Sequence, residues 1–377
     1  MMGIPMCQPD ITDAERSAVQ EVLGTPTLSI GPRLELFERK VAARVGATYA
    51  AGVASGTAGL HLCMLAADVG PGDVVLTSPF SFVASANAIL YVGARPVFVD
   101  VDPVSLTIDP DAVARAVARH DGVKAIMPVH VFGQPADMDP ILETAREHGF
   151  AVIEDACEAI GATYKGRAAG TLGDAGVFAF YPNKVMTTGE GGMIVTDDAA
   201  WDALFRSLRN QGRDVFDAWL SHSRLGYNYR LDELSAALGA VQIDRLSELL
   251  DRRARVAEWY RIRLERVEGV ALPRIAPWTT RVSWFVYVVQ VADRDRVMQE
   301  LERRGIPARP YFPPIHLQPV YRERFGFRPG DFPVTEAAGE RCLALPFFGR
   351  MREEQVDEVC GALAEILHGT RTRRAIG

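Results

Sequence analysis

The segment AGVFAFYPNKVMTTGEGGMIVTD, residues 175–197, places two nearly continuous apolar runs, 175–180 and 193–197, on either side of a stretch with one proline and three glycines. Continuous apolar runs of this length are typical of strands that are buried on both faces of a parallel sheet. Pro182 and the glycines exclude a regular helix between the runs. We therefore predict two core strands joined by an irregular loop that carries Lys184.

Five further runs of the same kind precede this segment, at residues 49–54, 73–78, 95–101, 123–132 and 151–155. Between them, aliphatic side chains recur every three to four residues, as in TAGLHLCMLAADVG (57–70) and DPDAVARAVARH (109–120), and this period predicts helices. Short buried strands that alternate with helices are typical of α/β units. The pattern predicts an α/β fold with a mostly parallel central sheet flanked by helices.

The pattern changes after residue 230. The chain continues with a long helical stretch (231–267), a strand-like run (284–293), a second helical stretch (295–305) and a proline-rich segment (306–319). Because proline does not fit inside helices or central strands, the last segment predicts an irregular loop. We predict a large α/β domain over residues 1–250, including an N-terminal helix, and a smaller C-terminal α+β domain over residues 251–377.

The composition is that of an ordinary globular protein, with 48% hydrophobic and 24% charged residues. Its 41 basic and 48 acidic side chains give a net charge of −7, which argues against partners such as nucleic acid or a membrane surface. The five cysteines are scattered and lack a CxxC spacing, so we expect neither a disulfide framework nor a metal site. No signal peptide or membrane span is recognisable, and we expect a cytoplasmic protein.

A first candidate binding site lies where a strand gives way to the helix of 57–70. Gly56 and Thr57 lie at this junction, where free backbone N–H groups and the positive end of the helix dipole suit a phosphate. The plain alternative is that Ser55 or Thr57 merely caps the helix. The segment matches neither a dinucleotide-binding nor a Walker fingerprint.

A second candidate lies at the end of the strand 151–155, in Glu154 and Asp155. Ligands of open α/β sheets bind beyond the carboxyl ends of the strands. We expect both carboxylates to project toward that edge, where the functional interpretation is a carboxylate held against a cationic group. The alternative is an aspartate that caps a following helix.

Lys184 is the third candidate. A nucleophilic lysine must lose its proton part of the time, and rigid backbone on both sides would fix where its amine points, although a loop lysine alone is ordinary. A phosphate cradle, a strand-end aspartate and a positioned lysine at one sheet edge are together what pyridoxal 5′-phosphate (PLP) requires. The phosphate would sit on the cradle, the ring nitrogen would pair with Asp155, and the aldehyde would form a Schiff base with Lys184.

The chain also resembles a known family. The motifs, in order, are SGTAGLHL, SPFSFVASANAI, VHVFGQPADM, EDACEAIGATYKG, NKVMTTGEGGMIVTD, LGYNYRLDELSAALGAVQ and PYFPPIHLQPVY. Over about residues 10–350 this order and spacing resemble the DegT/DnrJ/EryC1/StrS aminotransferases, and the perosamine-synthase-like members in particular. The resemblance implies the PLP-dependent aminotransferase fold of type I and activity on nucleotide-linked keto-sugars.

The resemblance implies roles for individual residues. Lys184 would be the Schiff-base lysine and proton carrier, and Asp155 the partner of the ring nitrogen. The remaining cofactor contacts would come from Gly56, Thr57, Phe82, Glu158 and, from the neighbouring subunit of a homodimer, Asn228. The substrate would lie near Ser29, Tyr311 and His316. The alternatives are core packing for Phe82 and a structural role for His316.

Two positions depart from the family pattern. Glu158 stands where the family often has Gln or His beside the phenolic oxygen of the cofactor. A carboxylate would repel a phenolate, so we predict that Glu158 is protonated or turned slightly away. Ala179 stands where the family commonly has a phosphate-binding serine, so we expect the phosphate to rely more on Thr57, the cradle amides and Asn228.

The leading hypothesis is an aminotransferase that moves an amino group from L-glutamate to a nucleotide-linked keto-sugar, with a 4-keto-6-deoxyhexose favoured, in a ping-pong cycle through the Lys184 Schiff base. One alternative is a cyclitol aminotransferase that acts on keto-inositols. Another is a non-catalytic, PLP-binding regulatory relative, since fold alone does not fix function. PLP-dependent sugar dehydration goes with replacement of the lysine by histidine, and Lys184 argues against it.

Overall fold

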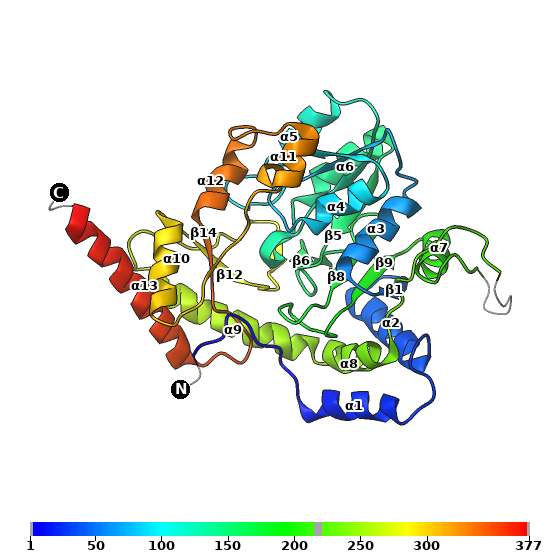
Figure 1. The fold of residues 1–377 in the computed structure, drawn as a ribbon, viewed down its shortest axis with the longest axis horizontal. Helices are drawn as coiled ribbons and strands as arrows, with labels where there is room; N and C mark the ends of the chain where they lie inside the picture. Colours follow the sequence, from blue (N-terminus) through cyan, green and yellow to red (C-terminus); the bar gives the residue numbers. More distant parts are fainter. Residues whose placement is uncertain (1–2, 215–220, 375–377) are drawn as a thin grey trace.

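The computed structural model of the chain describes residues 3–214 and 221–374, and a seven-stranded sheet lies at its centre (Figure 1). The strands, in spatial order, are β1 (Tyr49–Val53), β9 (Gly192–Thr196), β8 (Ala175–Ala179), β5 (Ala151–Asp155), β4 (Val123–Met127), β2 (Val74–Thr77) and β3 (Arg95–Phe98). Each coincides with one of the seven predicted runs. Strand β9 is antiparallel to both neighbours, and the remaining pairs are parallel. The expected mostly parallel α/β sheet is confirmed.

Helices cover both faces of this sheet. They are α2 (Pro32–Val45), α3 (Gly56–Ala66), α4 (Ala84–Tyr91), α5 (Pro110–Val117), α6 (Met138–His148), α7 (Ala199–Arg209) and α8 (Glu233–Asp244), with the short η1 (Val131–Gly133) after β4. Neighbouring side chains of a strand point to opposite faces. Val177 of β8 accordingly packs with α3, α4 and α7, whereas Phe178 packs with α2 and α8. Both faces are buried, which is why the strands read as continuous apolar runs.

The C-terminal part contains a smaller antiparallel sheet in the order β10 (Val270–Ala271), β12 (Tyr287–Val291), β14 (Cys342–Leu345) and β13 (Arg309–Pro310). Its helices are α10 (Arg294–Arg303), α11 (Pro319–Phe325), α12 (Pro333–Arg341) and α13 (Glu353–Arg374). A three-stranded sheet joins β11 (Thr279–Arg281) to β6 (Thr163–Tyr164) and β7 (Arg167–Ala168). The proline-rich segment 306–319 is irregular as predicted, apart from β13 and the short helix η2 (Ile315–Leu317).

The long helical stretch predicted over 231–267 is two helices, α8 and α9 (Leu246–Leu264), because the backbone at Arg245 leaves the helical region. Helix α9 spans two hydrophobic cores: Leu249 packs against the central sheet, whereas Tyr260 packs against the smaller sheet. In Figure 1 it runs as one rod beneath both parts. The predicted domain boundary after residue 250 falls inside this helix and stays a prediction.

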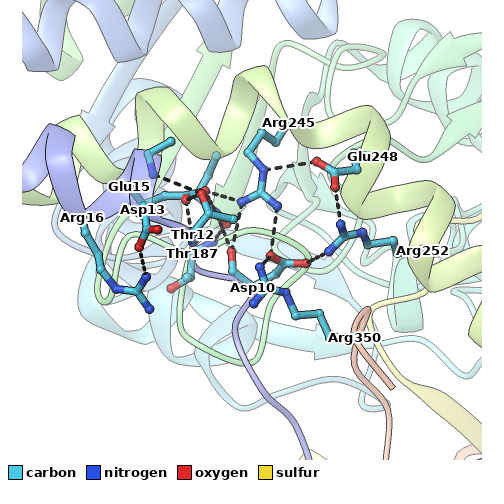
Figure 2. A network of polar contacts seen from close by, with 12 residues as sticks. Asp10, Thr12, Asp13, Glu15, Arg16, Thr187, Arg245, Glu248, Arg252 and Arg350 are labelled. Carbon is cyan, nitrogen blue, oxygen red and sulfur yellow. Dashed lines mark hydrogen bonds and ion pairs between the residues drawn. The ribbon is translucent and has the colours of Figure 1, made fainter. Parts of the chain in front are cut away.

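The N-terminal segment ties the two cores together before it enters α1 (Asp13–Leu23), which packs on α8 (Figure 1). Ile4 lies in the core of the smaller sheet, and the Met6 carbonyl accepts a hydrogen bond from the Phe347 N–H at 2.9 Å. Further along, the buried Asp10 carboxylate is bound by three arginines, Arg245 (3.0 Å), Arg252 (2.6 Å) and Arg350 (2.6 Å), as Figure 2 shows. This cluster links the N-terminal segment to the α8–α9 junction and to the segment after β14.

The same network reaches the loop that carries Lys184. The Gln242 side chain donates hydrogen bonds to the Asp10 carbonyl (2.8 Å) and to Glu15 (2.6 Å), and it accepts one from the Thr187 N–H at 3.3 Å. Arg245 also binds Glu15 at 2.5 Å. The loop after β8 therefore rests on a polar frame behind it.

Candidate active site

A cavity of about 450 Å³ lies beyond the carboxyl ends of the parallel strands. It is lined by the start of α3, the start of α4, the end of β5 with the turn after it, the loop after β8, and residues of the C-terminal part. Of the predicted site residues, seven line it: Gly56, Thr57, Phe82, Asp155, Glu158, Lys184 and Tyr311. These residues are far apart in the sequence, and the sheet edge brings them together.

The first turn of α3 forms one end of the cavity. Ser55 caps the helix, because its hydroxyl accepts a hydrogen bond from the Ala58 N–H at 3.1 Å. Gly56 is required there for space: a Cβ atom at this position would lie 2.7 Å from the Cys157 sulfur and 2.8 Å from the Ala179 methyl. Capping and an open cradle coexist, since Ser55 supplies the cap while Gly56 and Thr57 face the cavity.

Asp155 is the last residue of β5, and its carboxylate is buried and oriented. One oxygen accepts a hydrogen bond from the Ser85 hydroxyl at 2.6 Å, and the other accepts from the Cys157 N–H at 3.2 Å. Residues 156–162 form turns rather than a helix, so the helix-capping alternative does not apply. The carboxylate is therefore available to a cationic group in the cavity.

The expectation that Glu154 faces the same edge is wrong. Its fully buried side chain points away from the cavity and accepts hydrogen bonds from His130 (2.7 Å) and from the N–H groups of Gly170 (2.8 Å) and Gly173 (2.7 Å). The reason is the alternation of a strand, which places neighbouring side chains on opposite faces. Glu154 thus holds the turn 170–173, and only the second acid of the pair faces the site.

Lys184 lies in the loop between β8 and β9, with its side chain 15% exposed. Its N–H donates to the Tyr181 carbonyl at 2.9 Å, and its own carbonyl accepts from Arg253 at 2.9 Å. Its Nζ atom lies 3.6 Å from the nearer carboxylate oxygen of Glu158 and 4.0 Å above the centre of the Phe285 ring. The backbone is anchored on both sides, so the direction of the amine is set by the fold.

Glu158 is buried beside this amine. Burial raises the pKa of its carboxyl, although the Lys184 charge and a 2.9 Å hydrogen bond from the Phe132 N–H oppose that rise. The raised pKa favours the protonated form, one of the two alternatives we predict for Glu158 beside a phenolic oxygen.

Phe82 and Tyr311 line the cavity as the resemblance implies. Phe82 is 62% exposed, which excludes core packing, whereas its neighbour Phe80 is fully buried. A flat aromatic face at the rim of a cavity suits stacking on a planar ring.

Three predicted residues do not line the cavity within this chain. Ser29 and Asn228 are exposed, and their backbones pair with Asp232 and Asn210, respectively. His316 is fully buried, with its Nε2 atom 3.0 Å from the Glu336 carboxylate and its ring against Phe332, which favours the structural reading of this histidine. The predicted roles of all three stay predictions.

Several lining residues were not singled out from the sequence. Ser85 shares the SFVAS motif with Phe82 and lies one helical turn after it, so the three-residue spacing was a usable signal. Cys157 and Asn183 are sequence neighbours of predicted residues, and the Oδ1 atom of Asn183 is buried without a hydrogen-bond partner in the described part of the chain. Phe285 reaches the cavity through tertiary packing alone, and no local sequence pattern predicts its place there.

The amino-acid sequence matches the DegT/DnrJ/EryC1/StrS aminotransferase family over residues 9–364. The chain belongs to this family. It is 39% identical over 371 residues to a GDP-perosamine synthase of Caulobacter vibrioides, covering 97% of this chain and 98% of that protein.

Solved structures agree with this assignment. The S. venezuelae protein DesV superposes with a TM-score of 0.91 at 34% identity, covering 97% of this chain and 98% of that one. The protein Spr1654 of Streptococcus pneumoniae in its PLP form superposes with a TM-score of 0.90 at 26% identity, covering 97% and 98%. The fold is therefore that of the DegT-family aminotransferases, and the chain is a PLP-dependent aminotransferase.

The residues of this DegT-family site fit PLP. Gly56 and Thr57 bring the N-terminus of α3 to the cavity, where its free N–H groups suit the phosphate, and the oriented Asp155 carboxylate matches a protonated ring nitrogen. The anchored Lys184 amine matches the aldehyde.

Among the described residues no group of three or more His, Cys, Asp or Glu could hold a metal ion, and no described helix is long and apolar enough to span a membrane.

Proposed function

We propose that this protein transfers the amino group of L-glutamate to a nucleotide-linked keto-sugar, with a 4-keto-6-deoxyhexose as the favoured acceptor. The observation that carries the proposal is the cavity that joins the Lys184 amine, the Asp155 carboxylate and the start of α3. The name of the Caulobacter relative, which is 39% identical, supports a nucleotide sugar as the acceptor.

PLP, when bound, supplies an electron-accepting ring that eases loss of a proton from the carbon bearing the amine. Asp155 keeps a proton on the ring nitrogen, because an ionised carboxylate held by Ser85 and Cys157 favours a cation beside it. Lys184 acts as the general base and acid that takes and returns the proton at the reacting carbon. Its position over Phe285, largely shielded from water, keeps the amine on that path.

Glu158 and Ala179 adapt the site of this chain. Protonated Glu158 donates a hydrogen bond to a phenolic oxygen rather than repelling it, in keeping with the direction of its pKa. The Ala179 methyl lies against the position a Gly56 Cβ would take, so it occupies the cradle without offering a donor. The phosphate then relies on Thr57, on backbone N–H groups and on Asn228 of a second subunit.

The second subunit is part of the proposal. Asn228 is exposed, and its half-buried neighbours Tyr227 and Tyr229 stack with ring centroids 5.1 Å apart, next to the buried His61. Leu225 nearby is 84% exposed. Exposed apolar surface beside a residue assigned to the site supports a homodimer with shared active sites.

The test begins with the visible absorption band of the cofactor-loaded enzyme. Addition of L-glutamate should bleach this band, and a nucleotide-linked keto-sugar should restore it as the amino sugar forms. Lys184→Ala should lose the band and lower kcat about 10³-fold or more. A band that persists through glutamate would favour the non-catalytic reading, and turnover of a keto-cyclitol without turnover of any nucleotide sugar would favour a cyclitol aminotransferase.

A further inference from the structure

Arg253 lies in the middle of α9, between the residues that pack on the central sheet and those that pack on the smaller sheet. The residue is only 4% exposed. A buried guanidinium needs hydrogen-bond acceptors around it, because burying an uncompensated charge is costly. Its partners therefore show what the buried charge does.

The guanidinium binds backbone carbonyls from two separate segments. It donates to the Lys184 carbonyl at 2.9 Å, and to the carbonyls of Trp284 and Phe285 at 3.2 Å each. Its remaining face lies over the Phe347 ring, 5.6 Å from the centroid. No carboxylate lies within ion-pair distance of Arg253 in the described ranges 3–214 and 221–374, and burial lowers its pKa to about 10.

These acceptors place the nucleophilic amine from two sides. One is the backbone of Lys184 itself. Another belongs to Phe285, whose ring lies 4.0 Å below the Lys184 Nζ atom. The amine in turn lies 3.6 Å from Glu158. The Arg253 side chain thus holds both the Lys184 backbone and the backbone of Phe285, whose ring contacts the Lys184 amine.

We propose that Arg253 is a positioning residue for the transamination, which fixes the Lys184 backbone and the Phe285 ring so that the Lys184 amine is held at the reacting atoms. This inference rests on the proposed role of Lys184. It goes beyond that role, because the direction of the amine would then depend on Arg253, a residue of α9 that does not line the cavity.

The chemistry of the side chain favours this role over a purely structural one. Hydrophobic packing alone would be served by a neutral residue, since a buried charge without an acid opposes folding. A planar guanidinium has donors that diverge in fixed directions, so it can hold carbonyls on two segments at once. A lysine ammonium is a compact point donor and cannot hold both segments in the same geometry.

The test is Arg253→Lys in the cofactor-loaded enzyme, with three measurements: kcat, KM for glutamate, and the pH midpoint of the visible band that reports protonation of the Lys184 nitrogen. We expect kcat to fall about tenfold to a hundredfold, with KM changing much less. The Phe285 ring favours the charged nitrogen, so losing its alignment with the amine should move the midpoint to lower pH.

Arg263→Lys is the matched control. Arg263 lies on the same helix and binds Glu353 and Asp357 of α13, away from the loop that carries Lys184. This variant should lower the melting temperature and leave the pH midpoint unchanged. If Arg253→Lys behaves in the same way, with kcat within about twofold of the wild-type value, Arg253 is structural and the proposal is overturned.

Phe285→Leu covers the case in which Arg253→Lys does not fold. It removes the ring below the amine while the backbone carbonyl that Arg253 binds remains. It should also move the midpoint to lower pH, and an unchanged midpoint would overturn the proposal. Failure of the proposed function is distinct, because the wild-type enzyme would then lack a glutamate-sensitive band altogether.

Discussion

The floor of the cavity, formed by Asp155, Glu158 and Lys184, is largely buried and held by hydrogen bonds within the chain, whereas its mouth is open. At the mouth, Phe82 is 62% and Tyr181 52% exposed. The floor groups are held within one chain because a proton carrier and a charge partner must keep fixed positions. The mouth, where the keto-sugar would enter, is not closed by this chain alone, and we propose that a second subunit completes it.

Apart from loss of Lys184 itself, the largest effect should come from breaking the floor at Asp155. Asp155→Asn keeps the shape but removes the negative charge that holds the ring nitrogen protonated, so we expect kcat to fall about 10²-fold or more. Steady-state kinetics with glutamate and acceptor measure this. Ser85→Ala, which removes only the orienting hydroxyl, should have a smaller effect; an equal loss in both variants would mean that orientation, not charge, is what matters.

A second prediction concerns the frame behind the floor. Asp10→Asn removes the charge that three arginines share, and we expect the free energy of unfolding to fall by about 2 kcal/mol or more. Denaturant titration measures this. Asp13→Asn is the control, because its ion pair with Arg16 is exposed and should contribute less than about 1 kcal/mol.

The pH dependence of this contribution has a definite sign. Burial alone would raise the pKa of Asp10, but hydrogen bonds from Arg245 and Arg350 lower it overall. A carboxyl whose pKa is lower in the folded state stabilises the fold fully above its unfolded pKa of about 4, and the stabilisation is lost as the pH falls through the lower, folded value. The difference in stability between wild type and Asp10→Asn should therefore be constant near neutral pH and shrink as the pH falls below about 4.

A third prediction tests whether the mouth is shared. Lys184→Ala and Asn228→Ala should each be impaired alone, yet a mixture of the two unfolded and refolded together should recover about a quarter of wild-type activity. The reason is that half of the dimers are then mixed, and each mixed dimer has one intact site. Recovery no greater than the sum of the separate variants would show that each chain completes its own site.

The smallest effect should come from Glu158→Gln. If the protonated carboxyl is the active form, wild-type activity declines as the pH rises through the raised pKa of Glu158. An amide does not titrate, so the variant should lose this decline and differ from wild type by only a few-fold near neutral pH. The pH profile of kcat, measured for both proteins, tests this prediction. If the activity of the variant declines at high pH as it does in the wild type, another group causes the decline.

The sequence allowed the seven core strands to be predicted, because burial on both faces leaves continuous apolar runs. It did not show that β9 is antiparallel, since an apolar run has no direction. It also hid the break at Arg245, where helical residues continue without proline or glycine. The break lies in the backbone of Arg245, at φ −91° and ψ 2°, and the residue types around it do not signal this change.

In the site, too, the residues with a local sequence signal could be predicted, whereas those that depend on tertiary contacts could not. Lys184, Asp155 and Gly56 stand at junctions whose local chemistry is unusual, and so they could be selected from the sequence. Glu154 was misplaced because a pair of acids does not say which one faces the edge. Phe285 and Arg253 could not be found, because their importance comes from contacts with a loop that lies about a hundred and about seventy residues earlier in the chain.

The N-terminal segment has a consequence for how the chain is made. Asp10 leaves the ribosome early, but Arg252 follows 242 residues later, and Arg350 about 340 residues later. At about 5–20 residues per second, the segment waits roughly 20–70 s for its last partner. Ile4 also stays without the core that buries it over the same interval, because the other residues of that core, from Val256 onward, are made later. A nascent chain halted before residue 350 should therefore be markedly more sensitive to protease at its N-terminus than the released protein.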